Sequence, residues 1–125
     1  MAVNAKYYAR EANSVPLEFQ LYSVYTDETK TKMSKSAITS AQLTLRDDET
    51  GAVINGRENL DVLDKIDATG LFHMALTPED NVIVTATKDE EIHVATVTIV
   101  WTSADGQMTT KDEVNIHVRN LKFTA

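Results

Sequence analysis

Residues 92–118 read IHVATVTIVWTSADGQMTTKDEVNIHV, and this stretch decides the fold of the chain. Its first ten residues are apolar on both faces, which is typical of a strand in the middle of a sheet. An Asp-Gly turn follows, after which Val114, Ile116 and Val118 alternate with polar residues. Alternation with a period of two is the pattern of a half-buried strand. The stretch therefore predicts a long hairpin whose first strand is central in its sheet.

The same alternation recurs upstream in short segments that are separated by turn residues. The clearest are VPLEFQLYSVY, ITSAQLTLRD, LFHMAL and VIVTAT (residues 15–25, 38–47, 71–76 and 82–87), with weaker strands at AVI and ENLDVLDKI (52–54 and 58–66). Asn55-Gly56 suits a tight turn, because both residues tolerate a positive φ. Seven or eight strands at this spacing predict an all-β sandwich.

The two ends of the chain are predicted to lie outside this domain, which would span residues 15–120. Residues 1–14 are an N-terminal arm and residues 121–125 a C-terminal tail. The first dozen residues favour a helix, but a free helix of that length is marginal in water. We therefore expect the arm to order against something, such as a neighbouring subunit. The polar run TDETKTKMSKS (residues 26–36) predicts a long exposed loop.

Composition excludes several classes of function. The chain has 125 residues and no cysteine, so a single domain must fold by burial alone, as it could in a reducing cytoplasm. The net charge is −7, and residues 46–91 contain four basic and twelve acidic residues. Such a surface repels phosphate backbones and argues against nucleic acid as a partner. No signal-peptide core or membrane span is visible, and with its leading Met we expect a complete product made in the cytoplasm.

Three histidines are the first candidates for a chemical site. His73, His93 and His117 each lie in the middle of an expected strand, and the strands of His93 and His117 could be neighbours. A zinc site needs three or four convergent ligands, and the neighbours of these histidines along each strand are apolar or threonine. We therefore expect histidines that are partly buried or at the surface, and neither a metal nor another cofactor.

Carboxylates and nucleophiles give weaker signals. Asp61, Asp64 and Asp67 are spaced by three, which leaves calcium between loops as an alternative, although the DxDxDG pattern is absent. The pair Glu79-Asp80 follows a proline in a turn, where it would face water or cap the turn. No GxSxG elbow, cysteine or phosphate-cradling glycine loop is present, so the sequence predicts that the protein is not an enzyme.

Aromatic residues mark the surfaces that could carry contacts. Trp101 is predicted to close one end of the core with its N–H on a nearby acceptor, and an exposed ligand platform is the alternative. Four tyrosines cluster early in the chain and favour packing or an interface. The predicted interface residues are Tyr7, Tyr8, Tyr22, Tyr25, Lys30 and Lys32. The two segments expected to contribute most are the arm, with Tyr7 and Tyr8, and the loop 27–35, with the two lysines.

Two segments resemble parts of immunoglobulin-type domains. LTPEDNVIV (residues 76–84) is similar to the corner before their penultimate strands, although Val84 and Ala86 stand where the typical tyrosine and cysteine would fall. The hairpin ATVTIVWTSADGQMTTKDEVNIHV (residues 95–118) looks like the last two strands of bacterial and phage immunoglobulin-like modules. The resemblance implies an immunoglobulin-like antiparallel β-sandwich that is not a true antibody-type domain.

The whole order of segments, over residues 15–120, resembles small bacteriophage virion proteins. These include the N-terminal sandwich module of upper baseplate proteins, with segments like VPLEFQLYSV, ITSAQLTLRDDETG and DATGLFHMALTPED. The resemblance implies a non-enzymatic subunit of the virion, which decorates a capsid or joins head, neck or tail. Its partners would be other virion proteins and further copies of itself. The alternative is a carbohydrate- or cell-surface-binding module that uses Trp101 and loop acids.

Overall fold

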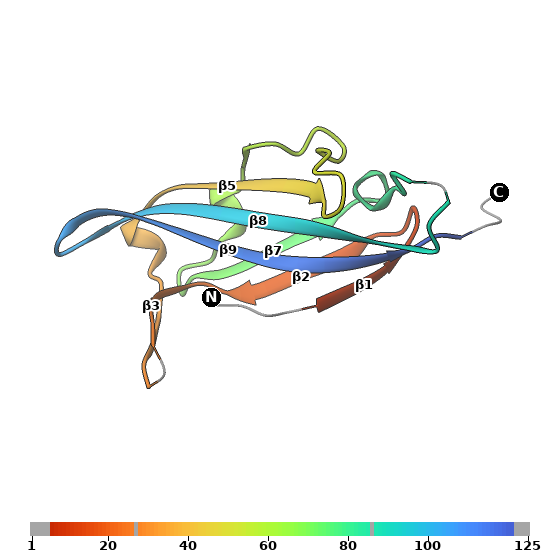
Figure 1. Cartoon of the computed structure of the whole chain (residues 1–125). Helices are drawn as coiled ribbons and strands as arrows, with labels where there is room; N and C mark the ends of the chain where they lie inside the picture. The colour runs from red at the N-terminus through yellow and green to blue at the C-terminus, as the bar shows by residue number, and fades with distance from the viewer. Residues whose placement is uncertain (1–5, 27, 86, 122–125) are drawn as a thin grey trace.

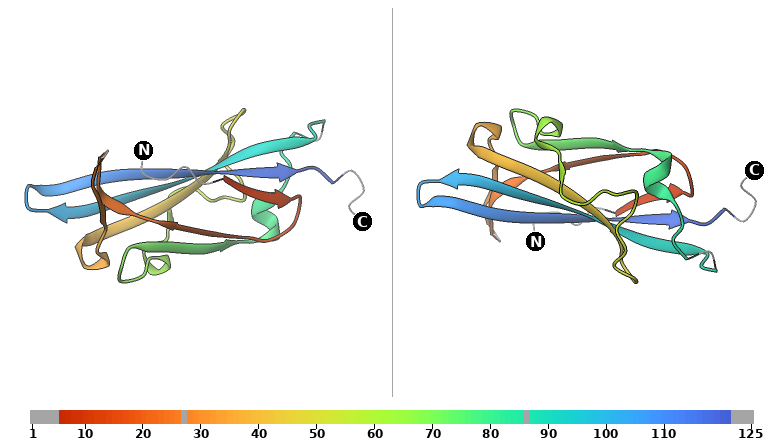
Figure 2. Two further views of the ribbon diagram at one scale, coloured as in Figure 1. Left: turned by 90° about the horizontal axis from the view of Figure 1, so that it is seen from below. Right: turned by 90° about the horizontal axis from the view of Figure 1, so that it is seen from above.

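The β8–β9 hairpin runs along the whole molecule and carries the fold, as the sequence predicts. In the computed structural model, which describes residues 6–26, 28–85 and 87–121, β8 (Glu90–Ser103) and β9 (Gly106–Arg119) pair antiparallel over their full length. The turn between them ends at Gly106, whose φ of +108° is open to glycine alone. Figures 1 and 2 show the tip of the hairpin reaching beyond the other strands.

Five strands form the main sheet in the order β1-β9-β8-β5-β6, so β8 is central. β5 (Ile38–Asp47) pairs antiparallel with β8, and the short β6 (Leu60–Asp61) pairs with β5 at one edge. At the other edge β1 (Lys6–Arg10) pairs with β9 in parallel, which makes the sheet mixed. The described strands within the expected domain, residues 15–120, all pair antiparallel with one another, and the one parallel strand lies in the segment expected to be an arm.

A second layer covers one face of this sheet (Figure 1). This layer is the antiparallel pair of β2 (Val15–Gln20) and β7 (Leu71–Leu76). A separate antiparallel pair, β3 (Tyr22–Tyr25) and β4 (Lys30–Lys32), lies outside it. Short 3₁₀ turns lie at Lys35–Ala37, Leu63–Lys65 and Pro78–Asn81. One continuous core is buried between the layers, so the chain is an all-β, sandwich-like protein. No helix of the described residues is long and apolar enough to cross a membrane.

Alternation along β7 explains how the two layers meet. Phe72, Met74 and Leu76 are buried while His73 is exposed, so His73 points away from the core as expected. The ring of Phe72 packs on Phe19 of β2 with 5.0 Å between their centroids. Each fully buried side chain of this size contributes about 1.5 to 3 kcal/mol relative to an exposed one. Burial on alternate positions therefore fixes the register of the two strands.

The weak helix preference of the first dozen residues is not realised in the part of the arm that the structure describes, which orders against another segment of the chain as a strand. Lys6–Arg10 forms a strand that pairs with β9 of its own chain and not with a neighbouring subunit. Residues 1–5 lie outside the described residues. The Tyr7 hydroxyl donates to the Glu18 carbonyl at 2.6 Å and accepts from the Glu18 N–H at 3.0 Å, which ties β1 to β2. The free edge of β9 and this double hydrogen bond outweigh a weak local helix preference.

The strand expected at residues 82–87 is also wrong for the part that the structure describes. The backbone N–H groups of Val84 and Thr85 donate to the carboxylate of Glu91, so this segment is a loop pinned by a side chain. Val82 and Val84 are exposed, and Ala86 lies outside the described residues. Alternation of apolar and polar residues predicts a strand here. It contains no information about which group accepts the backbone hydrogen bonds, and in this segment a side chain takes the place of a neighbouring strand.

Three smaller expectations are refined. The loop at residues 26–36 contains strand β4 and a buried side chain, Met33. The segment AVI contributes only a single bridge, between Val53 and Arg46. Asn55 and Gly56 have φ values of +53° and +65°, as expected for the turn. Trp101 is half-buried against the core, and its N–H donates to the Thr110 hydroxyl at 2.9 Å, as predicted.

Candidate interaction surfaces

The β3–β4 hairpin projects from the end of the sandwich and stands apart from both layers (Figure 1). It brings together four of the six predicted interface residues, because Tyr22 is opposite Lys32 and Tyr25 is opposite Lys30. The Lys30 ammonium lies 5.9 Å from the centre of the Tyr22 ring, a cation–π distance. The side chain of Tyr25 lies outside the described residues. Val24 is 43% exposed on the same ribbon.

The base of this hairpin is fixed firmly to the core. Leu21 and Met33 flank the ribbon and are both buried, and the Met33 N–H donates to the Leu21 carbonyl at 3.0 Å. The Leu21 N–H donates to the Gly70 carbonyl at 2.9 Å. Gly70 has a φ of +82°, and a Cβ built there would lie 2.1 Å from the Met33 carbonyl oxygen. Only glycine therefore allows the DATG turn to meet the hairpin this closely.

The two remaining interface residues have different surroundings on β1. Tyr7 is half-buried, and its hydroxyl is engaged by Glu18, so it holds the fold together. Tyr8 points outward and is 70% exposed. Its ring stacks on His117 of β9, with 5.0 Å between ring centroids and an interplanar angle of 28°. Of the pair, Tyr8 is the residue available for contact.

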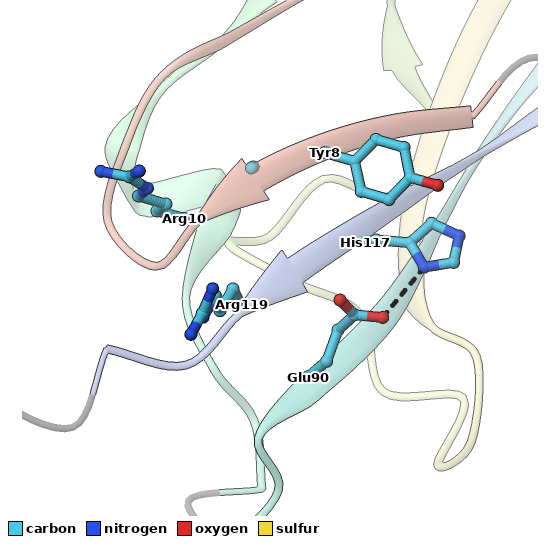
Figure 3. Close-up of a pocket in the computed structure, with 6 residues that line it drawn as sticks. Tyr8, Arg10, Glu90, His117 and Arg119 are labelled. Atoms are coloured by element: carbon cyan, nitrogen blue, oxygen red, sulfur yellow. Dashed lines mark hydrogen bonds and ion pairs between the residues drawn. The ribbon is translucent and has the colours of Figure 1, made fainter.

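Tyr8 belongs to a shallow pocket of about 300 Å³ on the outer face of the main sheet. Figure 3 shows Arg10 and Arg119 side by side at one end of the pocket, and the Tyr8–His117 stack at the other. The arginines are register partners in the parallel pair β1–β9. A hydrogen bond of 3.1 Å joins the Glu90 carboxylate to His117 Nδ1. No pattern in the sequence indicates this group of residues, because it arises from the pairing of the first strand with the last.

Like charges directly opposite one another destabilise a sheet. Within the part of the chain that the structure describes, neither Arg10 nor Arg119 forms an ion pair with a carboxylate. Two adjacent guanidinium groups form a fork that suits a carboxylate or another oxyanion. The pocket is therefore a candidate anion-binding surface beside an exposed aromatic ring.

The Glu79-Asp80 pair has a structural role and not a chemical one. Asp80 is fully buried and accepts hydrogen bonds from Asn55, Arg57 and Thr77, including 2.9 Å from Arg57 Nε. Burial opposes the charged form of Asp80, but these hydrogen bonds outweigh it and hold the pKa of the carboxyl below its ordinary value. The hydrogen bond that Arg57 donates to Asp80 in turn raises the pKa of Arg57. Asp80 therefore caps the turn, which is one of the two expected roles, and it does so from within the core.

The candidate calcium acids do not converge among the residues that the structure describes. Asp61 and Asp64 line a shallow surface pocket with Lys35, whose positive charge opposes a cation there. Asp67 accepts hydrogen bonds from the backbone of Thr69 and Leu71 and from the Thr69 hydroxyl. The backbone N–H of Leu71 and the Thr69 hydroxyl are the main causes that lower the pKa of Asp67. These acids cap turns.

The three histidines lie apart: His73 is on β7 in the second layer, and His93 and His117 are on opposite faces of the main sheet. His93 is opposite Ile116 and His117 is opposite Ile92, so the two histidines point to opposite faces and do not meet. His93 is fully buried, beyond the expected partial burial, and it faces two carboxylates. Glu91 lies two residues before His93, on the same face of β8. An acidic residue two positions before a histidine in an expected strand is the sequence pattern that could have indicated this contact.

A function for this chain is inferred from these surfaces and not from a related protein. No family model matches the chain, and no curated protein matches it significantly.

Proposed function

We propose that this chain is a non-enzymatic structural subunit of a bacteriophage virion, which works through protein–protein contacts with other virion proteins and with copies of itself. The resemblance of residues 15–120 to immunoglobulin-like virion modules is one support for this proposal. The observation that carries it is the β3–β4 hairpin, which projects from the sandwich and gathers Tyr22, Tyr25, Lys30 and Lys32 on one ribbon.

A two-stranded ribbon of this kind is poorly stabilised in water on its own. Three residues of β4 pair with β3, and in the described part of the chain no third strand covers either edge. Unpaired strand edges favour pairing with another chain. The ribbon also exposes Val24 and three consecutive side chains of β4. These features favour a partner surface that receives the hairpin.

Charge on the rest of the molecule favours a second copy as one such partner. Residues 46–91 carry a net charge of −8, and their exposed acids include Asp48, Glu49, Glu58, Asp61 and Asp64. Lys32 is exposed on the hairpin and forms no ion pair with a described residue. A contact between the two lysines of β4 and the acidic surface of the next copy is heterologous, and such contacts generate rings or helical arrays.

The test compares two matched double variants. Val24→Ser with Lys32→Glu alters the hairpin, and Val82→Ser with Lys111→Glu makes the same changes at exposed positions elsewhere. We expect both proteins to fold, and only the hairpin variant to lose incorporation into virions when it replaces the natural chain. Incorporation is measured by mass spectrometry of purified particles. Normal incorporation of the hairpin variant, or equal loss in both variants, would contradict the proposed interface.

A second candidate function, binding to an acidic carbohydrate at a cell surface, is favoured by the pocket in Figure 3. The two arginines suit a sugar carboxylate, and the exposed ring of Tyr8 suits stacking on a sugar ring. Trp101, the aromatic residue that the sequence favoured for this role, is half-buried with its N–H engaged. Saturation-transfer NMR with glucuronic acid and glucose tests this function. Binding of glucuronic acid alone, lost in Arg10→Gln with Arg119→Gln, would favour it over the first.

A further inference from the structure

A cluster of three buried ionisable side chains closes one end of the core. Asp47 is the last residue of β5 and is the register partner of His93 on β8, while Glu91 lies on the same face two residues earlier. The exposed fractions of these residues are 3%, 0% and 2%. One ligand atom from each of the three lies within 4.8 Å of the other two.

Each carboxylate is positioned by hydrogen bonds from the backbone. Asp47 Oδ2 accepts from the N–H and the hydroxyl of Thr50, at 2.8 and 2.9 Å. The two oxygens of Glu91 accept from the N–H groups of Val84 and Thr85. His93 Nε2 then lies 2.9 Å from Glu91 Oε1 and 4.0 Å from Asp47 Oδ1. The three polar atoms thus face one another, and hydrogen bonds hold both carboxylates in place.

The charge of this cluster is not balanced by the protein. Among the described residues, no lysine or arginine forms an ion pair with Asp47 or Glu91. With a neutral imidazole the group has a charge of −2, and with a protonated one a charge of −1. Uncompensated charge in a water-excluded place is costly. A divalent cation with neutral His93 would bring the charge to zero.

We propose that Asp47, Glu91 and His93 bind one divalent transition-metal cation, with Zn²⁺ as the best match to the donor set. Zinc accepts imidazole nitrogen and carboxylate oxygen at about 2.0 to 2.2 Å. Two atoms that share such an ion are therefore no more than about 4.4 Å apart, and His93 Nε2 meets this limit with both carboxylates. Calcium and magnesium require more ligands, all of them oxygen, so they fit less well.

Metal binding here would join three segments of the chain. The cation would connect the end of β5 to β8, and through Glu91 it would support the loop at Val84 and Thr85. That loop has no strand partner, so its opening gives the ion a route to the buried ligands. Because the unfolded chain has no preformed site, binding raises the stability of the folded state. The role of the site is structural, and it does not depend on the proposed virion function.

The test uses the full chain without an affinity tag that binds metal. Protein freed of metal with a chelator is melted with Zn²⁺, Co²⁺, Ca²⁺ or no addition, and bound metal is counted by elemental mass spectrometry. We expect one Zn²⁺ per chain and a rise in Tm of roughly 10 °C at about a hundred times Kd. Co²⁺ should give the visible absorption of a low-coordinate site, and Ca²⁺ should have no effect.

Matched variants separate this site from nonspecific binding. Asp47→Asn and His93→Asn each remove a ligand, whereas His117→Asn alters the exposed His117–Glu90 pair on the same two strands. We expect the Zn²⁺ response to persist only in His117→Asn. If His93→Asn fails to fold, Asp47→Asn and the metal content of the unaltered chain still decide the matter. Absence of bound metal and of any Tm change with millimolar Zn²⁺, or a normal response in Asp47→Asn, would overturn the proposal.

Discussion

Gly70 illustrates how much one residue determines in this molecule. It lets the turn before β7 approach the base of the β3–β4 hairpin, so it controls the position of the proposed interface. Its place in a turn was readable from DATG. The close approach to Met33 was not, because Met33 lies far away in the sequence, within a run that looked like a polar loop.

Substitution of Gly70 by alanine is expected to be severe. The new Cβ would overlap the Met33 carbonyl oxygen, and φ would remain in the left-handed region. We expect a loss of about 3 kcal/mol or more of unfolding free energy, measured by urea denaturation. Gly51→Ala is the matched control, because Gly51 has a similar φ of +74° with nothing within 4 Å. The control should lose only about 1 kcal/mol, and equal losses would contradict a steric role for Gly70.

Asp80 should make stability depend on pH in a defined direction. Its pKa is lower in the folded protein than in the unfolded chain, so its contribution is complete above about pH 4, near the unfolded pKa. The contribution is lost as pH falls through the folded pKa. Asp80→Asn should reduce the unfolding free energy at pH 7 by about 2 to 4 kcal/mol and flatten the loss between pH 5 and 3. Glu58→Gln, which removes an exposed ion pair with Arg46, should change neither quantity much.

At the scale of elements, it was easier to predict where strands occur than which strands pair with one another. The β8–β9 hairpin, β2, β5 and β7 follow from alternation and turn residues, and the structure confirms them. The loop at residues 82–85 has the same alternation but is held by Glu91, and β1 lies in an arm whose only local signal was a weak helix preference. The Arg10–Arg119 pair and the cluster at His93 were equally hidden, since both arise from pairing between distant segments.

The attachment of β1 to β2 can be tested by removing a single oxygen atom. Tyr7→Phe removes the hydroxyl that binds both the N–H and the carbonyl of Glu18. We expect a loss of about 1 to 2 kcal/mol in unfolding free energy, measured by chemical denaturation. Tyr8→Phe is the control, since the Tyr8 side chain points outward and keeps its ring on His117. Equal stability of Tyr7→Phe and the unaltered chain would show that β1 is held by its pairing with β9 alone.

At the scale of the whole molecule, charge is segregated, and any self-association should reflect this. If the hairpin of one copy meets the acidic surface of another, salt must weaken the contact. We expect sedimentation at increasing protein concentration to show assembly at 20 mM salt that decreases strongly by 500 mM. Lys32→Glu should abolish it, whereas Lys111→Glu should not. Association that grows with salt would indicate an apolar contact and contradict this arrangement.

The parallel pairing of β1 with β9 has a mechanical consequence. Because the two strands run in the same direction, tension applied at Lys6 and Arg119 pulls them past one another lengthwise. The hydrogen bonds between them then bear the load together and do not open one at a time. A subunit pulled by its two ends should thus resist extension until the whole strand slips, and single-molecule force spectroscopy would show this as one sharp rupture. Such a joint would suit a protein that transmits strain along a particle.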